Sequence, residues 1–405
     1  MKPTSFGRSS VEVGLSLSQD QLNPRKGWYV TGAAAIANFV TFGILFSFGV
    51  FLTPIADTFG TSSGPVAPLF SAAICFYYLF GVIGGRISDR IGLRPVVAAG
   101  TIMLTVGLFI SSQATSLWHL YVFFAPFVGG AVGCCYPPMI GTVGLWFKKE
   151  RTFAISLVLT GVGVGTLFVP VISRLLIDRW DWQVALGTYA VIGGIILTCC
   201  VFVCSTPSSG AKSIQLPLRQ IISSPKFRLL YAAVVLLGPG FYAPLAFYND
   251  HATKTGISPH YAALLVGLIG GSKVVAQLFA GSFGNRFNGM RQYQLGQVLI
   301  VFGLITWLVA GSSYPLFALS ALLHGAGWAI FVTATPTILA QWFGVENLAG
   351  TLGMFYTGLG IGALAGPAVL GFVIDAVNYE AAISVVIVTS AIAALISLFP
   401  DRISN

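Results

Sequence analysis

Charged side chains are scarce in this chain. Asp, Glu, Lys and Arg make up 8% of its 405 residues, whereas 56% are hydrophobic. A typical soluble domain carries about 25% charged residues, and apolar runs long enough to cross the roughly 30 Å core of a bilayer recur along this sequence. The composition therefore predicts a polytopic, all-α membrane protein. The net charge of +9 does not indicate nucleic-acid binding, because basic residues of such proteins must be apportioned between the two sides of the membrane.

Catalytic and metal-binding patterns are also missing. The sequence has no HExxH motif, no phosphate-binding loop, no paired carboxylates within its apolar runs and no Ser, His and Asp at one depth. We therefore expect neither an enzyme nor a bound cofactor. The six cysteines fall inside or at the edges of apolar runs, where they are expected to pack as small residues and to form no disulfide framework. A membrane sensor would bring a soluble output domain, and the sequence shows none.

Apolar runs predict about twelve membrane-spanning helices. Their expected ranges are 28–53, 65–85, 94–112, 117–142, 152–177, 183–204, 228–250, 259–283, 291–311, 314–340, 347–374 and 379–399. With the N-terminus in the cytoplasm, all but four of the 21 Lys and Arg residues fall on cytoplasmic segments. The exceptions are Arg174, Arg179 and Lys254 on the outer side and Lys273 within a span. This asymmetry predicts that both termini are cytoplasmic, and we expect a plasma-membrane protein.

The spans divide into two similar halves. We expect a cytoplasmic tail over 1–27, a six-helix bundle over 28–204, a cytoplasmic linker over 205–227, a second six-helix bundle over 228–399 and a short tail over 400–405. The sequence GVGVG of 161–165 returns as GLGIG at 358–362, and Asp178 returns as Asp375 at the same offset of 197 residues. Halves related in this way place the substrate site between them, near the midplane of the bilayer.

Lys273 is the candidate for the centre of that site. It is the only formal charge between His260 and Arg286. A Lys in an apolar helix costs roughly 2.5–3.5 kcal/mol on insertion scales and usually faces a cavity or a partner. Gln277 follows one turn later on the same helix face.

Four further residues are candidates for the same vestibule by their depth. They are Asn38, Tyr136, His324 and Trp328. Asn38 and His324 have the alternative role of interhelical hydrogen-bonding residues, and Trp328 that of a packing residue.

The connection between the second and third spans resembles the signature loop of the major facilitator superfamily. That loop reads G-x-x-x-D-R-x-G-x-R, and its counterparts here are Gly85, Asp89, Arg90, Gly92 and Arg94. A degenerate copy between spans eight and nine keeps Asn285 and Arg286. The resemblance implies the major facilitator fold and a latch that breaks when the halves rock. A solvated topogenic loop is the alternative.

Within the superfamily, the chain resembles the monocarboxylate porter and oxalate/formate antiporter group. The Gly27-Trp28 pair with the SFGVF end of the first span, and Trp146-Phe147 before a basic cluster, are similar to that group's two signatures. The span-eight Asp-x-x-x-Arg of animal-type members is replaced by Lys273-Val-Val-Ala-Gln277. No Lys occurs in span eleven, where the oxalate carrier type has one, so a monoanion is favoured over a dianion.

These observations predict a secondary active transporter of a small monocarboxylate of the lactate, pyruvate or formate class. Coupling to protons or to anion exchange is expected: burial favours the neutral amine of Lys273, and an entering anion favours its ammonium form. The expected partners are a small organic anion, protons and the lipid bilayer, with a monomer as the functional unit. The alternative is an exporter of amphipathic, drug-like compounds from the same superfamily.

Overall fold

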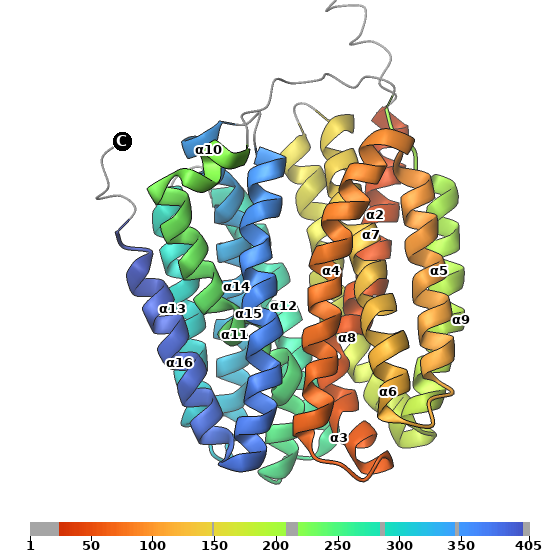
Figure 1. Ribbon diagram of the computed structural model, residues 1–405, viewed down its shortest axis with the longest axis vertical. Helices are drawn as coiled ribbons and strands as arrows, with labels where there is room; N and C mark the ends of the chain where they lie inside the picture. The colour runs from red at the N-terminus through yellow and green to blue at the C-terminus, as the bar shows by residue number, and fades with distance from the viewer. Residues whose placement is uncertain (1–23, 148–149, 208–217, 284–287, 345–347, 400–405) are drawn as a thin grey trace, which may run out of the picture.

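The protein is described here by a computed structural model that covers residues 24–147, 150–207, 218–283, 288–344 and 348–399 (Figure 1). These residues form helices joined by short connections and contain no β-strand. The helices are α2 (Pro24–Phe46), α3 (Phe48–Thr58), α4 (Ser63–Ile91), α5 (Leu93–Ser111), α6 (Leu117–His119), the π-helical η1 (Leu120–Phe124), α7 (Ala125–Trp146), α8 (Arg151–Arg179), α9 (Trp182–Val203), α10 (Leu218–Ser223), α11 (Pro225–Lys254), α12 (Pro259–Phe283), α13 (Gly289–Leu308), α14 (Tyr314–Phe343), α15 (Leu348–Ala376) and α16 (Tyr379–Ile396). The expected all-α membrane fold is thus confirmed.

Among the described residues, eleven helical segments are long and apolar enough to cross a membrane. The segment that falls below this threshold is α13, because Arg291, Gln292 and Gln294 lie in its first turns. It nevertheless packs between α14 and α16 as a full-length helix of 20 residues. The first predicted span, 28–53, differs from expectation, because it is interrupted after Phe46. There the Ser47 side chain bonds back to the Ile44 carbonyl at 2.8 Å, and α3 begins.

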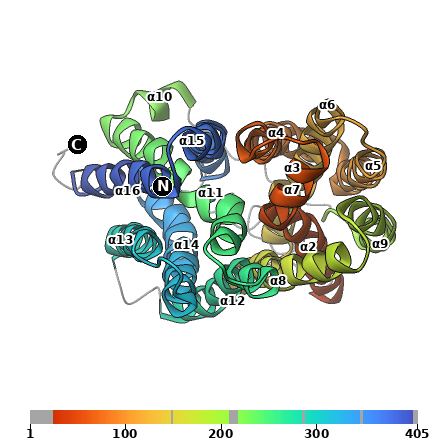
Figure 2. The same ribbon diagram turned by 90° about the horizontal axis from the view of Figure 1, so that it is seen from below.

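The helices gather on two sides of the molecule. Figure 2 shows α2 to α9 on one side and α11 to α16 on the other. The two sides, called the N-half and the C-half below, meet along two seams: α8 packs against α12, and α4 packs against α15. Both the first turn of α2 and the last turn of α16 lie at the upper end in Figure 1, which we call the terminal end. The lower end, with α3 and α6, is called the opposite end.

The repeated glycines explain how each half is packed. In α8, Gly161 lies directly against the carbonyl oxygen of Ala35 in α2, where a side chain would have no room. In α15, the equivalent Gly358 lies against Val234 in α11. Each repeat therefore lets the helix that carries it, α8 or α15, pack closely onto α2 or α11 of the same half. Small residues have this role in membrane bundles.

The middle glycine of each repeat faces the other half. Gly163 of α8 lies against Gly270 and Val274 of α12, and Gly360 of α15 lies against the ring of Tyr78 in α4. The same short sequence thus provides a contact within a half and a contact between the halves. The seams are closely packed because these positions carry no side chain.

Candidate functional site

A cavity lies between the two halves. It is enclosed by α2, α4, α7 and α8 from the N-half and by α11, α12, α14 and α15 from the C-half. Its lining consists of Phe42, Phe46, Tyr77, Tyr78, Tyr136, Leu159, Val162, Phe241, Tyr242, Lys273, Gln277, Trp328, Val332, Tyr356 and Leu359. Both halves therefore build one chamber, and movement of one half against the other would change it.

Lys273 supplies the charge in this lining. Its side chain is 6% exposed, and its ammonium lies 4.5 Å from the centroid of the Trp328 ring. No carboxylate is present among the residues that line the cavity. An ammonium over an aromatic face is stabilised by about 2 kcal/mol when desolvated, which is much less than a buried carboxylate would provide. The arrangement leaves Lys273 able to receive an anion.

Gln277 lies one turn after Lys273 on α12 and also lines the cavity. Its side chain is 2% exposed, and neither its amide nitrogen nor its amide oxygen has a hydrogen-bond partner among the described residues. A buried polar group without a partner costs about 1–3 kcal/mol. A ligand in the cavity would recover that free energy by bonding to Gln277.

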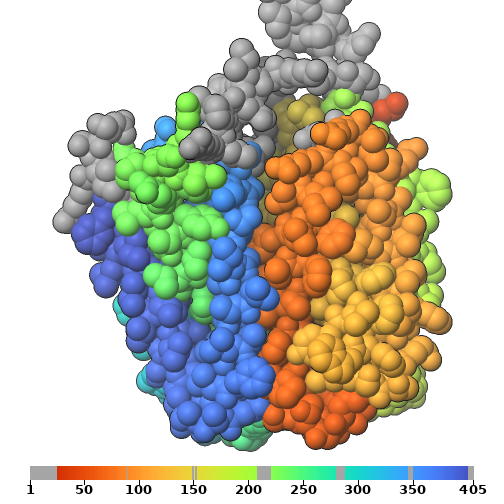
Figure 3. Space-filling view, in the orientation of Figure 1, coloured from red at the N-terminus to blue at the C-terminus, as the bar shows by residue number. Residues whose placement is uncertain are grey.

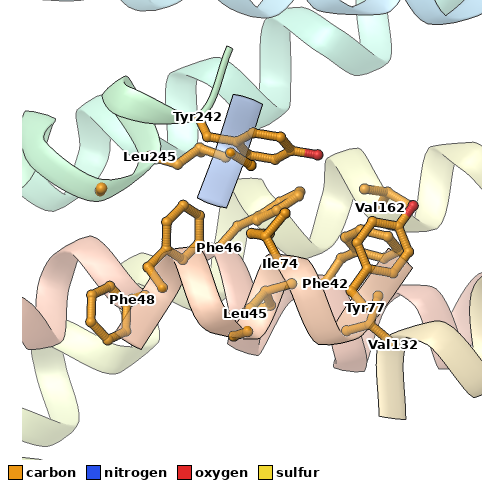
Figure 4. Close-up of a cluster of buried hydrophobic side chains, with 14 of the residues drawn as sticks. Phe42, Leu45, Phe46, Phe48, Ile74, Tyr77, Val132, Val162, Tyr242 and Leu245 are labelled. Carbon is orange, nitrogen blue, oxygen red and sulfur yellow. The ribbon is translucent and has the colours of Figure 1, made fainter. Parts of the chain in front are cut away.

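Tyr136 and Trp328, two of the candidates from the sequence, lie in the lining of the cavity. The Tyr136 ring lies 4.9 Å from Phe42, centroid to centroid, and the Trp328 ring lies 5.4 Å from Phe46. The second contact joins α14 of the C-half to α2 of the N-half. Figure 4 shows Phe42 beside Tyr77 and Phe46 beneath Tyr242 in the same cluster.

Asn38 and His324 do not line the cavity. Both are fully buried, at 0% exposure. Neither the amide nitrogen nor the amide oxygen of Asn38 has a hydrogen-bond partner among the described residues. His324 Nε2 lies 3.2 Å from the carbonyl oxygen of Phe241, and its ring packs edge-on against Trp328. His324 therefore packs against a residue of the lining without belonging to the lining.

Sequence reasoning did not single out Tyr78 and Tyr242, which also line the cavity. Tyr78 of α4 and Tyr242 of α11 bond to each other through their hydroxyl groups at 2.8 Å, across the two halves. The signal available beforehand was the presence of adjacent aromatic pairs, Tyr77-Tyr78 and Phe241-Tyr242, within apolar spans. Such pairs are common in buried helices, so the sequence alone did not distinguish them.

Asp250 closes the opposite end between the halves. From the N-half, the hydroxyl groups of Thr53 and Ser63 donate to its carboxylate at 2.7 and 3.2 Å. From the C-half, Lys254 donates at 3.1 Å and the Tyr379 hydroxyl also donates. The carboxylate is nearly inaccessible, with 2% of its side chain exposed. Its hydrogen bonds therefore hold α3 and α4 against α11 and α16.

Asp375 makes the second connection at the same end. It accepts a hydrogen bond of 2.5 Å from the Ser62 hydroxyl and one of 2.7 Å from the backbone N–H of Gly64. These groups begin α4, whose first-turn N–H groups have no partner within the helix. A carboxylate from α15 thus caps a helix of the other half. Figure 3 shows α4 and α15 in contact toward this end.

The signature-like loop has a local role among its described residues. Gly92 has φ of 90°, which allows the sharp turn between α4 and α5. Arg94 donates from Nη2 to the Phe202 carbonyl at 2.9 Å and from Nε to the Cys204 carbonyl at 3.2 Å. It thereby caps the end of α9 within the N-half.

The remaining residues of the signature-like loop and its degenerate copy are Gly85, Asp89, Arg90, Asn285 and Arg286. Gly85 and Arg90 lie in the last turns of α4, with Arg90 exposed. The side chain of Asp89, together with Asn285 and Arg286, lies outside the described residues.

Comparison of the sequence with known proteins identifies a family and several relatives. A family model described as Major Facilitator Superfamily matches residues 34–251 and 231–405. Mouse monocarboxylate transporter 11 is 26% identical over 86% of this chain and 81% of its own length. Rat monocarboxylate transporter 13 is 27% identical over 88% and 84%. MFS-type transporter 1 of Ophiocordyceps sp. (strain BCC 1869) is 23% identical over 84% and 76%.

Two solved structures share the arrangement of helices. One is a bacterial homolog of the human lysosomal transporter Spinster in an inward-facing and unoccupied conformation, with a TM-score of 0.71, 17% identity and coverage of 93% of this chain and 97% of that one. The other is a mutant of the nucleoside transporter NupG, with a TM-score of 0.74, 14% identity and coverage of 92% and 99%. At these identities the likeness concerns the fold alone.

Proposed function

Because the chain belongs to the Major Facilitator Superfamily and is a membrane transporter, we propose that it moves a small organic monocarboxylate by alternating access of the cavity between its halves. The observation that carries this proposal is Lys273, a buried ammonium in a cavity whose lining holds no carboxylate. A buried charge without a counter-charge is costly. An entering anion would supply that counter-charge, and Gln277 would donate a hydrogen bond to the same carboxylate.

The number of charges supports a monoanion. One cation can neutralise one carboxylate, and a second carboxylate in this lining would remain desolvated and unpaired. The names of the mouse and rat relatives are consistent with this substrate class.

Coupling to protons or to exchange of anions is part of the proposal. The apolar surroundings of Lys273 favour the neutral amine in the empty cavity, whereas a bound carboxylate favours the ammonium. Proton and substrate would therefore load together. If the ammonium form persists throughout the cycle, a second anion must replace the first, and exchange would result.

Uptake by proteoliposomes tests the proposal. We expect labelled lactate or pyruvate to accumulate when either an inward acid gradient or an internal anion is imposed, and the stimulating condition identifies the coupling. Lys273→Ala should lose at least about tenfold in uptake, which corresponds to roughly 1.4 kcal/mol. Lys26→Ala is the matched control, because Lys26 is exposed at the first turn of α2. Full transport by the Lys273→Ala protein would refute the central role of this residue.

Export of amphipathic compounds is the second candidate function. It is favoured by the aromatic side chains that make up most of the lining. Hydrophobic compounds would then compete for transport and short acids would not. Competition by short acids alone would exclude this candidate.

The placement in the membrane and the assembly are also proposals. We propose that the terminal end faces the cytoplasm of a plasma-membrane protein, because the basic residues of the sequence concentrate on segments at that end. Reporters fused to either terminus in whole cells would test this orientation. A single chain encloses the whole cavity, which supports a monomer in the bilayer as the functional unit. Cross-linking in proteoliposomes would test it.

A further inference from the structure

The lining of the cavity between the halves is mostly aromatic. Nine of its fifteen residues are Phe, Tyr or Trp, and four others are Leu or Val. The aromatic residues come from both halves, and Phe46 of α2 meets Trp328 of α14 with 5.4 Å between ring centroids. Aromatic rings stack on one another or meet edge to face with a gain of about 0.5–1.5 kcal/mol beyond burial. A planar ring in the substrate would find several such partners.

The two seams contribute different side chains to the lining. Lys273 and Gln277 belong to α12, which packs against α8. Tyr78 and Tyr356 belong to α4 and α15, which form the other seam. Figure 2 shows the two seams at opposite ends of the boundary between the halves. The cavity therefore has its charged side chain at the α8–α12 seam, while Tyr77, Tyr78 and Tyr356 form what we call the aromatic wall at the α4–α15 seam.

The absence of a carboxylate from the lining adds a restriction. The ammonium group of an amino acid would enter without a counter-charge and would meet Lys273, a like charge. A zwitterion is therefore disfavoured relative to the corresponding acid without an amino group.

We propose, on the basis of the function proposed above, that the substrate is a monocarboxylate with an aromatic ring on a short linker. Its carboxylate lies at Lys273 and Gln277, and its ring lies toward Tyr78 and Tyr356. The deaminated acid is preferred over the amino acid with the same ring.

Four ligands of related structure test this inference. They are 3-phenylpropanoate, propanoate without the ring, phenylalanine with an added ammonium, and 3-phenylpropanamide without the charge. Binding to the purified full chain is measured by thermal shift and by tryptophan fluorescence, because Trp328 lines the cavity. We expect 3-phenylpropanoate to bind roughly 10- to 100-fold more tightly than each of the other three. Lys273→Met should remove this preference over the amide.

A cavity-filling variant provides a second measurement. Leu359→Phe places a larger side chain in the lining on α15, at the aromatic wall. It should weaken 3-phenylpropanoate at least about tenfold more than it weakens propanoate, and the propanoate binding that remains shows that the variant is folded.

The outcomes separate this inference from the proposed function. If propanoate binds as tightly as 3-phenylpropanoate, the aromatic substrate is refuted and monocarboxylate transport stands. If phenylalanine does, the preference for the deaminated acid is refuted. If the amide binds as tightly as the acid and Lys273→Met changes neither, both proposals fall. If the Leu359→Phe protein binds 3-phenylpropanoate at the affinity of the parent protein, the ring does not lie at the α4–α15 seam. That result would overturn the assignment of the aromatic wall.

Discussion

Thr53 of the N-half and Asp250 of the C-half are joined by a hydrogen bond. The Thr53 hydroxyl of α3 donates to the Asp250 carboxylate of α11 at 2.7 Å. The pair lies at the opposite end, where the halves must separate if the cavity is to open there.

Loss of this hydrogen bond should favour opening. Thr53→Val keeps the shape of the side chain and removes the donor, at a cost of about 1.5–3 kcal/mol for a bond to a charged group. The ratio of open to closed protein should rise roughly 10- to 100-fold. Spin labels on Asp57→Cys and Val377→Cys, which are exposed positions in different halves, would show a larger population at long distance.

A nearby hydroxyl in the same half is the control. Thr58 accepts from Trp182 Nε1 and donates to the Pro54 carbonyl, both at 2.8 Å and both within the N-half. Thr58→Val should lower stability without changing the distance between the labels. Equal distance changes in the two variants would mean that the Thr53 bond does not hold the halves together.

Asp375 of α15 caps the start of α4, and removal of this cap should loosen the first turn of α4. Asp375→Ala deprives Ser62 and the Gly64 N–H of their acceptor, and loss of such a cap costs about 1 kcal/mol. Hydrogen exchange of the first turn of α4 should accelerate about fivefold or more. Asp178 is the repeat-related residue and pairs with Arg174 in its own helix. Asp178→Ala should leave that exchange unchanged, and acceleration in both variants would contradict a specific cap.

Adjacent glycines of α12 should differ sharply in their tolerance of a methyl group. At Gly270, an added Cβ would lie 2.5 Å from the Gly163 carbonyl oxygen and 2.5 Å from the Leu167 nitrogen, so the α8–α12 seam must widen. At Gly271, the nearest atom is a Leu167 methyl at 3.5 Å, which is an ordinary contact. We expect Gly270→Ala to lower stability by about 1–3 kcal/mol and to impair uptake. Gly271→Ala should match the parent protein in both assays, and similar behaviour of the two variants would argue against a close seam.

Replacement of Asn38 separates a structural role from a binding role. The residue is fully buried, its amide has no partner among the described residues, and it does not line the cavity. Asn38→Leu should therefore increase the free energy of unfolding by about 1–3 kcal/mol, because an unsatisfied polar group is removed. Uptake should be retained. Thr41→Val is the control, since the Thr41 hydroxyl is already bonded to the Ala37 carbonyl at 2.8 Å. A stable Asn38→Leu protein that has lost uptake would return Asn38 to the binding site.

The linear pattern of residues was sufficient for the fold. Apolar runs of bilayer length fix the number and order of the helices, since unpaired backbone groups are not tolerated in lipid. The offset of 197 residues between Asp178 and Asp375 was visible in the sequence and indicated two halves. Lys273 was also identifiable, because one ammonium in an apolar helix is costly enough to require a special environment.

Which side chains meet that ammonium was decided by the tertiary structure. Counting residues along a helix gives depth, and Asn38, Tyr136 and Trp328 all had suitable depth. Only the rotation and packing of each helix determine whether a side chain at that depth reaches the cavity, and Tyr136 and Trp328 reach it whereas Asn38 does not. The hydrogen bond between Thr53 and Asp250 likewise depends on two helix ends that the seams bring together. A hydrogen bond requires its two atoms to lie within about 3 Å, and the separation of two residues along the chain does not tell whether they come that close.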